Sequence, residues 1–258
     1  MIHIRTAAEI DRIAEGGRII GDLHDALEAR VAPGVSTLEV DDFVARFIAQ
    51  TEGALAAFKG LYGFPASACI SVNEEIVHGI PKAERVLEEG DIVTVDVGVK
   101  LDGWYSDSAR TFAVGEIDSE SRRLMDATRR SLDAAIEAAV PGNHVGDLGV
   151  AVMPAVKDEG VGILRDLVGH GVGRELHEDP QVPNVGRPGM GPKLRAGMVL
   201  AIEPMIALGT DQIRTLDDRW TVVTADGTRA AHFEHTVAIT ESGPRILTAP
   251  TAAATGSR

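Results

Sequence analysis

Cysteine, aromatic residues and positive charge are all scarce in this chain of 258 residues. The single cysteine, Cys69, excludes an internal disulfide framework and is typical of a reducing compartment. Aromatic residues make up only 4% of the chain, and 39 acidic residues outnumber the 25 lysines and arginines, which gives a formal net charge of −14. Because phosphate binding requires a basic surface, this charge argues against DNA, RNA and anionic membranes as partners.

Long apolar runs are also missing. No stretch has enough consecutive apolar residues to span a bilayer, and charges at positions 5, 9, 11 and 12 exclude a signal peptide at the N-terminus. Linkers rich in proline or serine are absent as well. We therefore expect a soluble, cytoplasmic protein with one domain over residues 1–248 and a flexible tail over residues 249–258.

What the chain does have is a repeated order of elements. Apolar residues at helical spacing predict helices over residues 6–31, 36–50, 119–140 and 145–159. Each helix pair is interrupted by Pro-Gly, at Pro33-Gly34 and at Pro141-Gly142, and the two prolines lie 108 positions apart. Pro-Gly is common punctuation after helices, so coincidence stays open. Strands are expected at residues 69–72, 91–114, 199–206, 220–224 and 232–240.

The order of helix, Pro-Gly, helix and strands occurs twice, and this favours an internally duplicated α+β fold. Its halves would cover about residues 1–115 and 116–248. In such a fold the strands of both halves form one sheet that is backed by helices. A site shared by both halves would lie over the sheet between them.

Two acidic residues stand out in the predicted hairpin over residues 91–114, whose strands are joined by Asp102-Gly103. Asp96 and Asp107 interrupt strands of β-branched and aromatic residues. In any hairpin with an even-numbered loop they face each other directly or diagonally on one side of the ribbon. Carboxylates about 4 Å apart repel by about 4 kcal/mol at an effective dielectric constant near 20. They then need a shared proton or a cation, unless one is a solvated edge residue and a bulge turns the other away.

Three more polar residues occupy apolar strands in the second half. His170 stands among glycines in LVGHGVG, Glu203 lies in LAIEPM, and Glu234 enters the strand of HFEHTVAI. The glycines allow close backbone approach and leave the imidazole accessible to a metal. Each acid alone is more simply an ion pair or an edge residue, but buried acids without partners are costly. Four acids and one histidine together favour a metal site.

The segments VDVGV, DSARTF, GHGVG, IEPM and FEHTV, together with NEEIVHGIP, HEDPQVPN and DDRWTVVTADG, resemble the type I methionine aminopeptidases. The resemblance covers nearly the whole chain. It implies the pita-bread fold, in which two αβ halves related by a pseudo-twofold axis share a curved antiparallel sheet. It also implies a monomer.

The resemblance further implies two divalent metal ions. Asp107 and Glu234 would bridge them, Asp96 would chelate one, and His170 and Glu203 would complete the other. Four carboxylates and two dications are formally neutral. Oxygen-rich ligation with one imidazole suits Mn, Fe or Co, and Zn stays open.

As a function, the resemblance implies removal of the initiator methionine from nascent polypeptides when the next residue is small. Glu203 would relay a proton, His177 would donate to the developing oxyanion, and His78 would contact the scissile amide. Without the resemblance, His78 would be interpreted as a satisfied loop histidine. Contact with the ribosome stays open.

A methionine pocket is implied at five positions, each of which ordinary core packing also explains: Leu61, Phe64, Cys69, Leu176 and Trp220. Leu61 stands where tyrosine is common in the family, and Leu176 where phenylalanine is common. Gly98, beside Asp96, stands where threonine is also found. These differences remove bulk or a hydroxyl without adding charge, so methionine is still expected to fit.

Two alternatives come from the same fold. Xaa-Pro dipeptidases and aminopeptidases use a similar ligand set, but they carry an additional N-terminal domain for which 258 residues leave no room. Non-catalytic pita-bread binding proteins have lost ligands, whereas all five ligand positions are filled in this chain.

Overall fold

The four predicted helices are all present, and each ends a few residues earlier than its sequence pattern indicates. The computed structural model describes residues 1–157 and 159–251. Residues 28–31 form a turn instead of extending the first helix, and the N–H groups of Arg30 and Val31 donate to the carbonyl of Leu27. The capping box predicted at its start is confirmed, because Thr6 accepts from the backbone of Glu9 and the Glu9 carboxylate accepts from that of Thr6. The helices are α1 (Ala7–Leu27), α2 (Thr37–Ile48), α3 (Ser119–Glu137) and α4 (Val145–Val156), with a short 3-10 helix η1 (Leu61–Gly63).

The predicted duplication is confirmed in the geometry of α2 and α4. Both helices have 12 residues, and their first residues lie 108 positions apart. Gly34 and Gly142, which precede them, both have a positive φ, of 89° and 103°, a conformation that glycine adopts at little cost. At the start of α2 the carboxylate of Glu39 accepts the backbone N–H of Ser36, and at α4 Asp147 does the same for His144.

Among the described residues, the strands form a curved layer that is divided into four hydrogen-bonded sheets. The first sheet has the order β1-β4-β2 with β5 on β4, and another has the order β15-β14-β9-β7-β8. The strands are β1 (Ala54–Ala56), β2 (Cys69–Val72), β3 (Glu75–Val77), β4 (Ile92–Leu101), β5 (Trp104–Ala113), β6 (Gly162–Ile163), β7 (Val168–Gly171), β8 (Glu178–Pro183), β9 (Val199–Ile202), β10 (Met205–Ala207), β11 (Ile213–Thr215), β12 (Val222–Thr224), β13 (Ala230–His232), β14 (His235–Thr240) and β15 (Gly243–Ile246).

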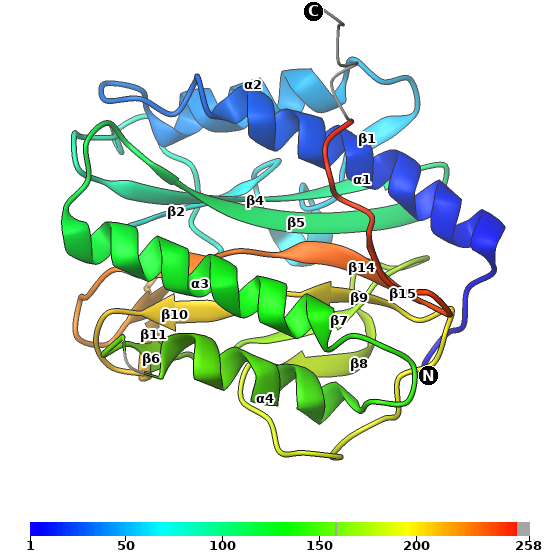
Figure 1. The fold of residues 1–258 in the computed structure, drawn as a ribbon. Helices are drawn as coiled ribbons and strands as arrows, with labels where there is room; N and C mark the ends of the chain where they lie inside the picture. Colours follow the sequence, from blue (N-terminus) through cyan, green and yellow to red (C-terminus); the bar gives the residue numbers. More distant parts are fainter. Residues whose placement is uncertain (158, 252–258) are drawn as a thin grey trace, which may run out of the picture.

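The two halves meet where β5 lies beside β14, between the helix pairs (Figure 1). Side-chain hydroxyls supply most of the bonds at this seam. Thr236 Oγ1 accepts the N–H of Asp107 at 2.9 Å and donates to its carbonyl at 2.8 Å, and Ser108 Oγ donates to the carbonyl of Glu234 at 2.5 Å. The backbone adds a bond from the N–H of Glu234 to the carbonyl oxygen of Ala109 at 2.9 Å. The shared layer is thus joined by hydroxyl bridges in place of an extended ladder.

Each half has its own apolar core. In the first half α1 and α2 pack on β4 through residues such as Leu23, Val44 and Val95. In the second half α3 and α4 pack through residues such as Leu124 and Leu148 on strands that include β9 and β14. In Figure 1 the helices α1 and α2 lie over β4 and β5, and α3 and α4 lie over the strands of the second half.

The last described residues lie against α1. Thr251 donates its backbone N–H and its hydroxyl to the carboxylate of Asp22, at 2.7 and 2.9 Å. Of the tail predicted over residues 249–258, residues 252–258 lie outside the described part of the chain. Among the helices described, none is both long enough and apolar enough to cross a membrane.

Candidate metal centre

Asp96 and Asp107 lie diagonally across one face of the hairpin, as the parity argument predicts. The two-residue loop pairs Leu101 with Trp104, so that Gly98 faces Asp107 and Asp96 faces Ala109. The ten paired residues of β4 and β5 hold both acids in a continuous ladder. Both acids line a cavity of about 880 Å³.

His170 lies on β7, a strand that pairs with β8 on one side and with β9 on the other. A Cβ atom at Gly169 would lie 2.3 Å from the carbonyl oxygen of Ala201, and one at Gly171 would lie 2.2 Å from that of Asp179. The close backbone approach expected of these glycines is therefore confirmed. His170 Nδ1 is 2.9 Å from the carbonyl oxygen of Gly171. An N–H donated there leaves Nε2 with its lone pair, as metal-binding histidines require.

Glu203 and Glu234 leave the sheet where strand pairing is interrupted. The predicted strand over residues 199–206 divides into β9 and β10 at Glu203-Pro204, because proline lacks the N–H that a ladder needs. The predicted strand over residues 232–240 likewise divides into β13 and β14 around Glu234. At each break an acidic side chain reaches the same cavity.

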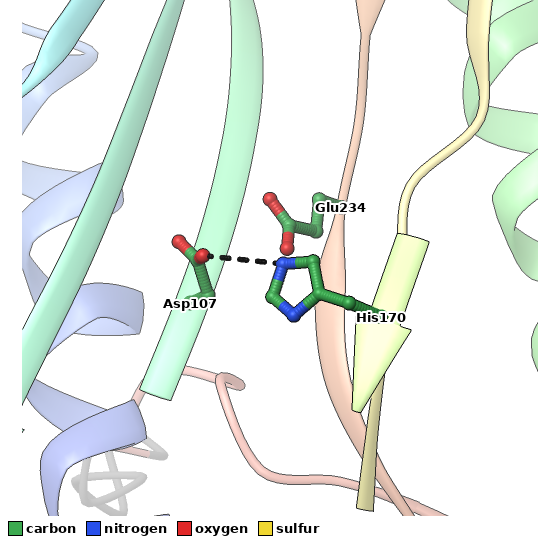
Figure 2. Close-up of side chains that lie close together, drawn as sticks. All are labelled: Asp107, His170 and Glu234. Carbon is green, nitrogen blue, oxygen red and sulfur yellow. Dashed lines mark ion pairs between the residues drawn. The ribbon is translucent and has the colours of Figure 1, made fainter. Parts of the chain in front are cut away.

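The ligand atoms of Asp107, His170 and Glu234 all lie within 4.8 Å of one another, with Asp107 and His170 facing each other across the seam (Figure 2). His170 Nε2 is 3.8 Å from Asp107 Oδ2 and 3.6 Å from Glu203 Oε1. Among the described residues, no hydrogen-bond donor reaches the buried oxygens Asp96 Oδ1, Asp107 Oδ1 and Glu234 Oε1. Buried acceptors without donors, grouped around an imidazole lone pair, fit a divalent cation.

Burial shifts the pKa of every member of this group toward its neutral form. It raises the pKa of Asp96 to about 7, and it raises the pKa values of Asp107, Glu203 and Glu234 well above their usual range, with the neighbouring carboxylates adding to the effect. Burial, and after it the nearby His177, lowers the pKa of His170 to about 4. Ionising these carboxylates is therefore costly without a cation, and a bound metal ion would offset that cost.

The two other predicted histidines lie at the rim of the same cavity. The ring of His177 packs edge-on against that of His170, with centroids 4.5 Å apart. His78 follows β3 with a positive φ of 59°, and its ring meets Trp220 edge-on at 6.3 Å. Both side chains are exposed to solvent, and they line the same cavity as the acids.

The five predicted pocket residues gather in one apolar cluster that lines the cavity. Phe64, Cys69 and Leu176 are buried, and Leu61 and Trp220 pack against them. A side chain at position 98 would force the Phe58 ring to move, because a Cβ atom there would lie 2.7 Å from that ring. Phe58, which the sequence analysis did not single out, therefore occupies the space above Gly98 and forms a pocket wall.

Two further residues at the site were missed. His232 is buried beside Glu203 and Glu234. It stands two residues before Glu234. Because side chains alternate between the two faces of a strand, this spacing indicates that the two side chains share a face in the predicted strand over residues 232–240. Tyr62 is 77% exposed and stacks on His177 with centroids 6.1 Å apart. No sequence pattern distinguishes it from an ordinary loop tyrosine.

Comparison with known proteins agrees with this geometry. Residues 11–241 match metallopeptidase family M24. A methionine aminopeptidase of Clostridium acetobutylicum is 50% identical over 248 residues, which are 96% of this chain and 99% of that protein. The crystal structure of a methionine aminopeptidase from Thermotoga maritima superposes with a TM-score of 0.94 at 45% identity, over 96% of this chain and 100% of that one.

A more distant neighbour is a prolidase from Pyrococcus furiosus, with a TM-score of 0.75 and 25% identity, over 96% of this chain and 66% of that one. The fold shared with both kinds of enzyme is the pita-bread fold. On these likenesses and the site described above, the chain belongs to metallopeptidase family M24 and, within it, to the methionine aminopeptidases.

Proposed function

We propose that this chain is a metal-dependent aminopeptidase that removes the N-terminal methionine from polypeptides whose second residue is small. The observation that carries the proposal is the convergence of four carboxylates and one imidazole, from both halves, beside an apolar cluster. Such a site can hold a cation, a peptide amino end and a methionine side chain at once.

Two divalent ions are proposed as the cofactor. Asp107 and Glu234 would lie between them, Asp96 would hold one, and His170 and Glu203 would hold the other. The buried oxygens without donors and the free Nε2 of His170 support this assignment. Ions in such a site activate water near neutral pH and polarise the substrate carbonyl. The donor set suits Mn, Fe, Co or Zn.

The surrounding side chains have separate roles in the proposal. Glu203 accepts the proton of the attacking water and passes it to the leaving amine. His177, next to His170, donates a hydrogen bond to the oxyanion that develops on the carbonyl. His78, held at the rim by the turn after β3, contacts the scissile amide.

The methionine side chain is proposed to lie in the apolar cluster of Leu61, Phe64, Cys69, Leu176 and Trp220. The leucines at positions 61 and 176 widen the pocket relative to tyrosine and phenylalanine. Phe58, a member of the same cluster, fills the space over Gly98. The cluster is apolar, which favours an unbranched thioether over polar side chains.

For the setting, we propose the cytoplasm, where nascent chains carry their initiator methionine and a single buried thiol stays reduced. The catalytic unit would be a monomer over residues 1–248, because both halves contribute ligands to one centre. Nascent chains are the proposed partners, and a ribosome contact would bring them to the cavity.

A tripeptide assay tests this function. Met-Ala-Ser should be hydrolysed, a chelator should abolish the reaction, and a divalent ion should restore it. Met-Leu-Ser should be a much poorer substrate. Hydrolysis of a Gly-Pro dipeptide in preference to Met-Ala-Ser would indicate an Xaa-Pro dipeptidase instead. A protein that binds peptides without hydrolysis under all conditions would be a non-catalytic member of the fold.

The two rim histidines allow a second test. His78→Ala and His177→Ala should each lower kcat, by about 10²-fold or more for a lost oxyanion donor, while the bound metal stays nearly intact. Metal analysis of the purified variants provides the check. Loss of metal from either variant would assign that histidine to the metal shell and contradict its proposed role.

A further inference from the structure

His232 is an additional member of the centre that none of the roles above includes. It ends β13, where it pairs with Met205, two residues beyond Glu203. Its backbone is fixed to β5 through the hydroxyl of Thr111, which accepts the N–H of His232 at 2.9 Å and donates to its carbonyl at 2.8 Å. The residue is 1% exposed.

The imidazole of His232 is buried without a hydrogen bond. Neither Nδ1 nor Nε2 has a hydrogen-bond partner among the described residues. Nε2 lies 3.7 Å from Glu203 Oε2 and 3.9 Å from Glu234 Oε2. Leaving a buried polar group unpaired costs about 1–3 kcal/mol, so a ring kept in this place has a partner when the centre is assembled.

The Glu203 carboxylate therefore lies between two imidazoles. Its Oε1 faces Nε2 of His170 at 3.6 Å, and its Oε2 faces Nε2 of His232 at 3.7 Å. The two rings differ in how their other nitrogen is held. His170 Nδ1 is bound to a backbone carbonyl, which leaves Nε2 as an acceptor. His232 Nδ1 has no such partner among the residues described. Its proton is therefore favoured on Nε2, beside the two carboxylate oxygens.

A role for His232 as a metal ligand fits the geometry less well. All five proposed ligands line the cavity, whereas His232 is not among its lining residues. Its distance to Glu203 is about 0.7 Å longer than a normal N–H···O bond of about 3.0 Å. Hydrogen bonds of catalytic groups are often long without substrate and tighten when the substrate complex forms.

We propose that His232 is a positioning residue for Glu203. Its Nε2–H donates to Glu203 Oε2 and so fixes the carboxylate rotamer in which Oε1 faces His170. The inference rests on the proposed function, in which Glu203 moves the proton. Side chains that orient a ligand carboxylate in this way typically contribute 10- to 100-fold in activity or metal affinity.

Two substitutions separate this role from simple packing. His232→Gln keeps a neutral N–H donor of similar reach, whereas His232→Leu keeps the bulk and removes the donor. His24→Leu is the matched control, because His24 is also buried at 1% exposure but hydrogen-bonds to the carbonyl of Val95, away from the centre.

With Met-Ala-Ser, His232→Leu should lower kcat 10- to 100-fold with KM changed less than about threefold, because the apolar pocket is untouched. His232→Gln should recover kcat to within about threefold of the unsubstituted protein, and His24→Leu should leave it unchanged. Equal losses in His232→Gln and His232→Leu, or no loss in either, would overturn the proposal.

Two readouts do not depend on turnover. Titration calorimetry of the metal-free proteins with Mn²⁺ should show weaker binding in His232→Leu, restored in His232→Gln, with the number of ions unchanged. Loss of one ion in both variants would make His232 a ligand and overturn the proposal. Imidazole ¹⁵N spectra of the metal-free protein should show the Nε2–H tautomer for His232, and the Nδ1–H tautomer would overturn it. If the unsubstituted protein lacks peptidase activity, the proposed function fails, yet these two readouts still test His232.

Discussion

The two halves of the molecule repeat the same scaffold but supply the centre in different ways. In the first half both acids stand on one hairpin, inside an uninterrupted ladder. In the second half His170, Glu203 and Glu234 come from separate strands, and both glutamates stand where a strand breaks. The duplicated helices α2 and α4 differ little by comparison.

This difference shows how one scaffold yields an asymmetric site. The ladder of the first half places its carboxylates rigidly, and the broken strands of the second half let longer side chains reach toward them. The hydroxyls of Ser108, Thr111 and Thr236 then fix the distance between the halves, because they bond the backbone beside Asp107, Glu234 and His232.

The largest expected effect is on activity when one acid is removed from either half. Asp107→Asn and Glu234→Gln should each lower kcat/KM for Met-Ala-Ser by about 10³-fold or more, because the ions contribute several kcal/mol and each 1.4 kcal/mol is a factor of ten. Steady-state kinetics at saturating Mn²⁺ measure this. If only one of the two variants were impaired, the two halves would not share a common centre.

The same two variants should not be less stable when metal-free. Each substitution replaces a buried carboxyl, whose pKa is raised by burial, with a neutral amide. Thermal unfolding in the presence of a chelator should therefore give a Tm equal to or above that of the unsubstituted protein. A large decrease in Tm would mean that the two acids stabilise the metal-free fold itself.

The next effect concerns the seam. Thr236→Val removes both hydrogen bonds to the Asp107 backbone and leaves buried groups unpaired, so the free energy of unfolding should fall by about 2–4 kcal/mol. Urea unfolding measures this loss. Thr240→Val, on the same strand but bonded within its own turn, serves as the control and should cost less than about 1 kcal/mol. Equal losses would show that the seam has no special role.

A smaller effect is expected in the pocket of the first half. Gly98→Thr would press on the Phe58 ring, since a Cβ atom there lies 2.7 Å from it. Overpacking of this kind costs about 1–3 kcal/mol, and KM for methionyl peptides should rise. Adding Phe58→Leu to Gly98→Thr should restore part of the lost stability and lower KM again. If Gly98→Thr alone has no effect on Tm or KM, Phe58 does not occupy the space that threonine would need.

The smallest effect concerns two positions that match in the duplicated fold. His24 is buried in α1, and the residue 108 positions later, in α3, is Leu132. Burial, followed by Arg110 and His235, lowers the pKa of His24 to about 3. The unfolded chain takes up a proton below about pH 6.5 that the folded chain refuses, so stability is lost as the pH falls from about 6.5 toward 3.

Between pH 6.5 and 5 this loss should amount to about 2 kcal/mol. His24→Leu, which gives the first half the residue of the second, should flatten the pH dependence by that amount. Denaturant unfolding at several pH values measures the slope in both proteins. Identical slopes would mean that His24 does not resist protonation in the fold.

Much of this arrangement could be predicted from the sequence. Thr6, Ser36 and the two Pro-Gly pairs mark the helix boundaries and the duplication, and the loop at Asp102-Gly103 fixes the hairpin register. The acids of the centre were recognisable because Asp96, Asp107, Glu203 and Glu234 interrupt apolar strands.

The rest depended on contacts between distant segments. Serine and threonine are ordinary in strands, so nothing in the sequence indicates that Ser108 and Thr236 join the halves. The space above Gly98 is filled by Phe58 from a different segment. His232 differs from a packed core histidine in that its buried ring nitrogens have no hydrogen-bond partner within the described part of the chain, and only the three-dimensional structure shows this.

Anomalous diffraction from crystals of the Mn²⁺-loaded protein tests the central claim most directly. We predict a metal peak about 2.0–2.2 Å from side-chain ligand atoms of Asp107, His170 and Glu234, so that one ion contacts both halves. A second peak beside Asp96 would complete the pair. An active, loaded protein whose ions contact residues of only one half would contradict the account.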